Sequence, residues 1–140
     1  MKDIENLVYT NIVTALSAAS VNAETSSVYI DDPASFPYVY FAEITRRVDT
    51  AYMSTSGIDE AFNLTFECAV YSDKTPGAKQ ECKEIMRIVD EAMSNMRFRL
   101  SYHATVPNLD RNITRLIHRY TGTVRIAYNG TDTEFYVIPK

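Results

Sequence analysis

Side chains that could carry out chemistry are few in this sequence of 140 residues. It contains two histidines, His103 and His118, and two cysteines, Cys68 and Cys82. Neither histidine has a Cys, Asp or Glu at a spacing typical of a metal site, and both cysteines fall on apolar faces of predicted elements, where small buried hydrophobic residues belong. The four glycines are scattered, so no phosphate-binding loop is predicted. We therefore expect no catalytic residues, no metal and no cofactor, and we do not expect an enzyme.

Charge is segregated along the chain. The net charge is −4, yet the segment from Arg97 to Arg125 carries six arginines and a single acid, Asp110. Four of the arginines are predicted to lie on the polar faces of neighbouring strands and to form one basic patch: Arg97, Arg99, Arg115 and Arg119. They either face solvent and pair with acids elsewhere in the fold, or contact an acidic neighbouring subunit or DNA passing nearby.

The remaining charges indicate no further site. The adjacent acids Asp59-Glu60 and Asp90-Glu91 should point in different directions and are interpreted as solvated surface. An acidic net charge without a basic helix disfavours a free-standing DNA-binding module. No apolar run approaches the ~20 residues that span a bilayer, and the first residues lack the apolar core of a signal peptide. We expect synthesis in the cytoplasm and no membrane partner.

The clearest structural patterns lie between residues 62 and 106. Residues 62–71 and 98–106 alternate apolar and polar side chains, as strands with one buried face do. Between them an apolar stripe from Ala78 to Met96 predicts a helix, with Thr75 as its cap and Pro76 at its first position. A helix of about 20 residues and a strand of about ten have similar lengths, so the two strands should run parallel, with another strand between or beside them.

The strand predicted over residues 38–45 is apolar on both faces, with Val39 and Phe41 on one of them. Such a strand is covered on both sides. Because two helices can hardly cover both faces of a sheet, we expect a neighbouring subunit to cover one face. Residues 46–60 are predicted to form a long polar loop.

The two ends of the chain complete the predicted fold. Residues 3–19 predict an amphipathic helix, and residues 113–128 predict a long strand in which Gly122 marks a bulge or bend. Asn129-Gly130 predicts a two-residue hairpin turn that sets Val124 opposite Phe135. We therefore predict one α+β domain over residues 1–140: a mixed, mostly antiparallel sheet with two helices packed on one face and a C-terminal β-hairpin.

The order of these elements, together with short patterns, resembles a known family. The patterns are the strand Pro37-Tyr38-Val39-Tyr40-Phe41-Ala42-Glu43, the strand ending Ala69-Val70-Tyr71-Ser72, the long helix, the strand opening Phe98-Arg99 and the closing strand with Arg119-Tyr120. Over most of its length the chain resembles the tail terminator (tail completion, head-tail joining) proteins of long-tailed bacteriophages. The resemblance implies a small α+β subunit that closes into a hexameric ring on the tail tube, stops its growth and presents a surface to the head-side connector.

This resemblance implies a structural virion protein of the tail or neck, assembled in the host cytoplasm. Its implied partners are copies of itself, the tail tube protein and the connector protein, and the family has no catalytic residues to carry over. Candidate interface residues, inferred from this sequence alone, are Arg97, Arg99, Arg115, Arg119, Val39 and Phe41. The alternatives are another neck or minor capsid component, or a small ligand-binding domain or enzyme that uses the sheet face around His118 and Tyr120. A pocket with a strongly perturbed titrating group would favour the last.

Overall fold

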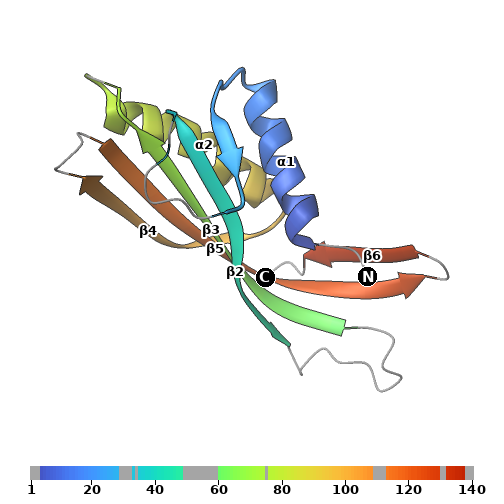
Figure 1. The fold of residues 1–140 in the computed structure, drawn as a ribbon. Coiled ribbons are helices and arrows are strands. Elements are labelled where there is room, and N and C mark those ends of the chain that lie inside the picture. Colours follow the sequence, from blue (N-terminus) through green and yellow to red (C-terminus); the bar gives the residue numbers. More distant parts are fainter. Residues whose placement is uncertain are drawn as a thin grey trace.

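The computed structural model describes residues 4–28, 33, 35–48, 60–74, 76–108, 113–129 and 132–137. In this part of the chain two helices lie on one face of a mixed sheet (Figure 1). The elements are α1 (Ile4–Ala18), β1 (Glu24–Ser26), β2 (Tyr38–Val48), β3 (Glu60–Ser72), α2 (Ala78–Asn95), β4 (Arg99–Asn108), β5 (Ile113–Asn129) and β6 (Asp132–Val137). We call the side of the sheet that carries the helices the helix face and the opposite side the outer face.

The sheet order is β1-β2-β3-β5-β4, and β6 also pairs with β5. β3 and β4 are each antiparallel to β5, so they run parallel to one another with β5 between them. This confirms the arrangement that the lengths of the helix and the two strands predict. All strand pairs other than β1 with β2 are antiparallel, and the predicted α+β fold is confirmed.

The main core lies between the helices and the sheet. α1 buries Ile4, Val8, Ile12 and Leu16, and α2 buries Cys82, Ile85, Met86, Val89 and Met93. At the centre of the sheet Phe66 stacks on Phe41 with a centroid separation of 5.4 Å and meets the edge of Phe98 at 5.3 Å. The three rings join β2, β3 and the segment between α2 and β4 into one cluster.

Over residues 38–42 both faces of β2 are covered by this chain itself, which corrects the expectation that a neighbouring subunit covers one. Val39 and Phe41 are each 1% exposed on the helix face, so a second subunit cannot reach their side chains. On the outer face a smaller apolar cluster is closed by Phe36 and contains Tyr38, Tyr40, Ala42, Ala69, Tyr71, Ile113 and Ile117. Two helices suffice because the outer face needs no helix: its own side chains form a second small core.

A bulge in β4 overturns the alternation predicted through residues 98–106. Leu100 pairs with Tyr120 but Tyr102 pairs with Arg119, so Ser101 is an extra residue. Its hydroxyl donates to the backbone carbonyl of Arg119 at 3.3 Å. Beyond the bulge, from Tyr102 to Val106, the side chains lie on the face opposite to the predicted one, which moves Tyr102 to the outer face and His103 to the helix face.

The ends of α2 differ from the predicted ones. The helix begins at Ala78 after Gly77, whose φ of 107° is left-handed, so Pro76 lies before the helix and not in its first position. Thr75, the predicted cap, lies outside the described residues. At the other end the amide of Phe98 donates to the Met93 carbonyl at 3.0 Å and that of Arg97 donates to the Ser94 carbonyl at 2.9 Å. This pair of bonds is a Schellman motif.

The C-terminal hairpin forms, but in another register than the one predicted. Asn129 pairs with Asp132, which sets Val124 opposite Val137 where Phe135 was expected. The shift is two residues, the same as the period of strand alternation, so alternation cannot distinguish the two registers. The pairing of β3 with β5 is continuous through Gly122, which excludes a bulge there. Most of the predicted loop, residues 49–59, lies outside the described part of the chain.

Candidate functional site

The structure divides the four predicted arginines into two groups. Arg119 lies on the outer face of β5, where its Nε donates to Oε2 of Glu67 at 2.9 Å and its guanidinium lies 4.9 Å from the ring centre of Tyr102. Arg115 lies over the ring of Tyr71 at 5.4 Å. For Arg119, pairing with an acid of the same fold is therefore the correct interpretation. Both side chains are held by contacts within their own chain.

Arg97 and Arg99 lie near the end of the β4 and β5 pairing that is far from Arg115. Arg99 is the first residue of β4 and pairs with Thr121. Arg97 was predicted to lie in the same strand, but it lies in the turn before it. On β5, Arg115 is six positions from Thr121, about 20 Å at the usual strand rise, whereas Arg119 is two positions from it, about 7 Å. The predicted patch is therefore interrupted at Arg115, and Arg119 is paired with Glu67.

A third arginine, which the sequence patterns did not single out, completes this second group. Arg47 of β2 lines the same pocket of about 330 Å³ as Arg97 and Arg99. The polar side chains of Asn63, Thr65 and Thr121 also line this space, which we call the arginine pocket. Arg47 lies in a segment that was predicted to be a loop, so only its place in β2 brings it to the sheet.

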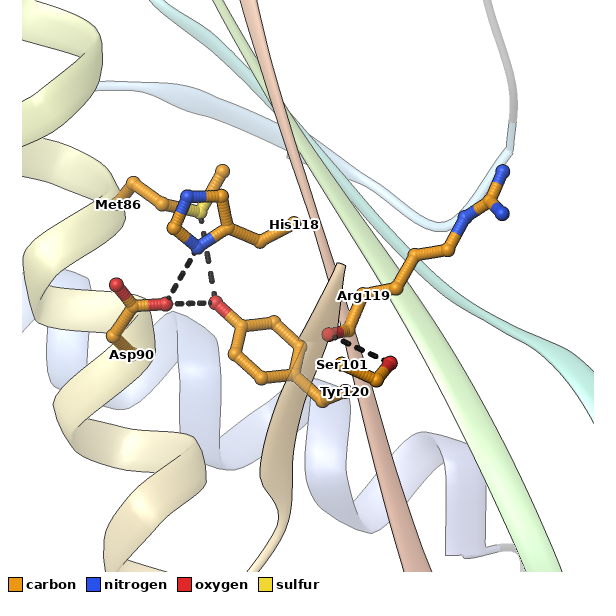
Figure 2. A network of polar contacts seen from close by, with 6 residues as sticks. All are labelled: Met86, Asp90, Ser101, His118, Arg119 and Tyr120. Atoms are coloured by element: carbon orange, nitrogen blue, oxygen red, sulfur yellow. Dashed lines mark hydrogen bonds and ion pairs between the residues drawn. The ribbon is translucent and has the colours of Figure 1, made fainter. Parts of the chain in front are cut away.

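On the helix face a polar cluster joins α2 to β5 (Figure 2). One carboxylate oxygen of Asp90, Oδ1, accepts hydrogen bonds from Nδ1–H of His118 at 2.8 Å and from the hydroxyl of Tyr120 at 2.5 Å. Tyr120 is 1% exposed, and its hydroxyl also lies 3.6 Å from Sδ of Met86. The sequence predicted that Asp90 is a solvated surface residue. In the structure it instead accepts hydrogen bonds from two residues of β5, His118 and Tyr120.

A signal for this cluster was present in the sequence. Asp90 follows Met86 by four residues and precedes Met93 by three, which places it on the flank of the apolar stripe of α2. His118 and Tyr120 lie on the apolar side of their strand, two residues apart. Polar groups on the apolar sides of two elements that pack together require one another as partners.

The cluster contains the residue types of a Cys-His-Asp nucleophilic triad, but its cysteine does not have the properties of a nucleophile. Cys68 pairs with His118 across β3 and β5, so cysteine, histidine and aspartate lie close together. Cys68 is 0% exposed, and burial raises the pKa of its thiol far above the ordinary value. A nucleophilic cysteine needs the opposite, a lowered pKa and an open approach. Burial likewise raises the pKa of Tyr120, which keeps its hydroxyl a hydrogen-bond donor to Asp90.

The geometry of this cluster favours a structural role. The groups with strongly raised pKa values, Cys68, Cys82 and Tyr120, are each enclosed in the core and do not lie in an open pocket. In the described ranges no group of three or more His, Cys, Asp and Glu residues could hold a metal ion. The contacts of Asp90 fasten α2 to β5.

Both cysteines are expected to resist thiol reagents until the chain unfolds. Burial, with a smaller effect of Glu81, raises the pKa of Cys82 to about 12. At pH 8 its thiolate population is then lower than that of an exposed thiol by roughly a thousandfold. A colorimetric disulfide reagent should titrate two thiols per chain in denaturant and almost none in the native protein. A Ser94→Cys control, exposed on α2, should react at once; equally fast reaction of the wild type would contradict the burial of both thiols.

The two sheet edges are open and unlike each other within the described residues. β4 pairs only with β5, and along this edge Leu100, Tyr102 and Val106 are 47%, 46% and 40% exposed. On the other edge β1 pairs only with Tyr38 to Tyr40, which leaves the rest of β2 without a described strand partner on that side. One amide there, that of Glu43, donates to Oε2 of Glu5 in α1 at 2.8 Å.

Neither described helix is long and apolar enough to cross a membrane. Comparisons with protein-family models and with curated proteins find no match for this chain.

Proposed function

We propose that this protein is a structural subunit of a long-tailed bacteriophage, of the tail terminator type. In this proposal copies of the chain close into a ring, hexameric by the resemblance, that ends elongation of the tail tube and joins it to the connector on the head. The order of elements, which carries the resemblance, and the α+β fold support the proposal. The observation that carries the assembly step is the open edge of β4.

The edge of β4 has the properties of a surface that pairs with another chain. A strand of ten residues presents a row of backbone donors and acceptors on its open side. Monomeric proteins usually block such an edge with charged side chains, proline or a covering loop. β4 has a bulge at Ser101 and Pro107 near its end, but it also exposes the apolar side chains of Leu100, Tyr102 and Val106. A neighbouring copy would cover both the backbone groups and the apolar side chains.

The two different edges favour a ring over a two-fold dimer. Contact between β4 of one copy and the β2 edge of the next joins unlike surfaces, and repetition of such a heterologous contact closes into a ring. The arm formed by β5 and β6 adds a second contact. β5 has 17 residues and spans about 56 Å, whereas the 18 residues of α2 span about 27 Å. The end of the sheet formed by β5 and β6 therefore extends past α2 (Figure 1), with β3 pairing with β5 as far as Ile126.

Light scattering after size exclusion tests the assembly step. The wild type is expected to show a mass near six times the 15.9 kDa of one chain, and Leu100→Lys/Val106→Lys is expected to be monomeric because it places two charges on the β4 edge. Both side chains are well exposed, so the circular dichroism spectrum should not change. Val28→Lys, at a side chain that is 66% exposed and outside β4, is the matched control and should assemble like the wild type.

A wild-type protein that is monomeric at every concentration and salt would remove self-assembly as support for this function. Assembly by the β4 double variant would show that the ring uses another surface. Labelling of purified virions with an antibody against the protein is expected at the head end of the tail tube; a position elsewhere on the neck or capsid would favour another virion component.

A further inference from the structure

The arginine pocket lies where β5 has, over two residues of one edge, no strand partner among the described residues. β4 pairs with β5 as far as Thr121, and β6 pairs from Val124 onwards. β4 and β6 therefore follow one another along the same side of β5 (Figure 1). Gly122 and Thr123 lie at the gap between them, and both line the pocket. The pocket thus lies on the outer face at the point where β5 changes partner from β4 to β6.

The register places positive charge on opposite sides of a neutral floor. Arg47 on β2 pairs with Asn63 on β3, and Arg99 on β4 pairs with Thr121 on β5. β3 and β5 are neighbours, so the floor is two strands wide and the strands that carry the arginines flank it. Arg97 adds a third guanidinium from the turn before β4. Donors thus surround this space on more than one side.

Glu67, the described acid two positions from Thr65 on the same face of β3, is paired with Arg119 and with none of the three arginines of the pocket. Arg119 pairs with Glu67, and Arg46, the neighbour of Arg47 on the other face, pairs with Glu43, each at 2.9 Å. In the part of the chain that the structure describes, no such ion pair reaches the three arginines of the pocket. Three guanidinium groups around one space repel one another until an anion occupies it.

The floor supplies further donors that are already oriented. The hydroxyl of Thr123, a residue 6% exposed, donates to Oδ1 of Asn63 at 2.6 Å, which leaves the Nδ2 amide group of Asn63 as a donor. Thr65 and Thr121 add hydroxyl groups beside it. A carboxylate presents two acceptor oxygens, whereas a phosphate group presents more oxygens in several directions. Hydrogen-bond donors from β2 and β4 on two sides, and from β3 and β5 between them, match the several oxygens of a phosphate group.

The backbone conformation of Arg97 indicates that the fold does not require an arginine side chain at this position. Its φ of 70° is left-handed, at the position after the helix cap where glycine is the usual residue. A side chain in this conformation costs about 1 kcal/mol or more. Glycine would therefore end α2 at least as well, and it would remove one of the three arginines from the pocket.

We propose that the arginine pocket binds a phosphate group, with Arg47, Arg97 and Arg99 as the charged ligands and Asn63 and the threonine hydroxyls donating from the floor. Free phosphate and the phosphodiester of a nucleic acid share this chemistry. The site goes beyond the assembly role, and its occupancy does not depend on ring formation. Arg115 and Arg119 take no part in it.

The test is a nuclear magnetic resonance titration of the full chain at constant ionic strength in chloride. The probes are inorganic phosphate and, separately, a six-nucleotide single-stranded DNA. Saturable shifts of the amides of residues 63–65, 97–99 and 121–123 are expected with at least one probe. Arg47→Gln/Arg99→Gln should weaken binding by tenfold or more, as the loss of charged hydrogen bonds requires. Arg46→Gln/Arg87→Gln removes the same charge outside the pocket and should change binding less than about twofold.

Arg97→Gly separates binding from folding. It is expected to bind the probe about tenfold more weakly while its melting temperature stays equal to or above that of the wild type. Competition identifies the source: an oligonucleotide that displaces phosphate assigns the site to phosphodiesters, and one that does not assigns it to free phosphate. Absence of saturable binding to both probes would overturn the proposal, as would an equal loss in the two double variants, which indicates unspecific attraction. Because the readout is local, it holds for monomer and ring alike.

Discussion

Replacing Phe66 with alanine is expected to lower the free energy of unfolding by about 3–5 kcal/mol. Phe66 is 0% exposed and contacts the rings of Phe41 and Phe98, with centroids 5.4 and 5.3 Å away. Alanine would leave a cavity where β2, β3 and the segment after α2 meet. Domains of this size are stable by about 5–15 kcal/mol, so the loss is a large part of the total. Urea unfolding followed by circular dichroism measures it.

Two matched variants show whether the effect comes from packing. Phe66→Leu keeps most of the apolar volume and should cost clearly less than alanine. Leu100→Ala removes a large apolar side chain that is 47% exposed and should change the unfolding free energy by less than about 0.5 kcal/mol. If Phe66→Ala unfolds at the same urea concentration as the wild type, the three-ring cluster does not hold the sheet and the helix layer together.

Replacing Asp90 with alanine is expected to cost about 1–3 kcal/mol of unfolding free energy. The substitution removes the acceptor of the Tyr120 hydroxyl, and the Sδ atom of Met86 at 3.6 Å is a weak replacement. His118 loses the same partner. The Asp90 side chain is 37% exposed, so water can reach part of the vacated space and the cost should fall in the lower half of this range.

A double-mutant cycle isolates the contact between α2 and β5. Asp90→Ala/Tyr120→Phe leaves no hydroxyl without an acceptor, so its cost should be smaller than the sum of the two single changes by about 1 kcal/mol. Asp90→Asn keeps an acceptor oxygen and should be closer to the wild type than Asp90→Ala. Strictly additive costs in the cycle would mean that the bond seen in Figure 2 does not fasten the helix to the sheet.

Much of the fold follows from local patterns in the sequence. Strict alternation in residues 62–71 and an apolar stripe along residues 78–96 depend only on periods of two and 3.6 residues, and they predict β3 and α2 correctly. Comparing the lengths of these elements was enough to predict that β3 and β4 run parallel with another strand between or beside them. The apolar positions of Cys68 and Cys82 predicted two buried thiols, and both are buried.

The candidate sites depend on register, which local patterns do not contain. One extra residue, Ser101, exchanges the faces of Tyr102 and His103, and a shift of two residues in the hairpin leaves the alternation unchanged. Asp90 contacts His118 and Tyr120, and Glu67 contacts Arg119. In each of these pairs the two residues are at least 28 positions apart in the sequence.

The sequence by itself determined most of the segments that form strands and helices and the apolar faces of α1, α2 and β3, because these depend on near neighbours in the chain. Only the tertiary structure decided that Arg119 is paired with an acid, that Val39 and Phe41 are enclosed, and that Arg47 joins Arg97 and Arg99 around one pocket. Those outcomes depend on which strands are neighbours and in what register, and many sequences with the same periodicity could pair in more than one way.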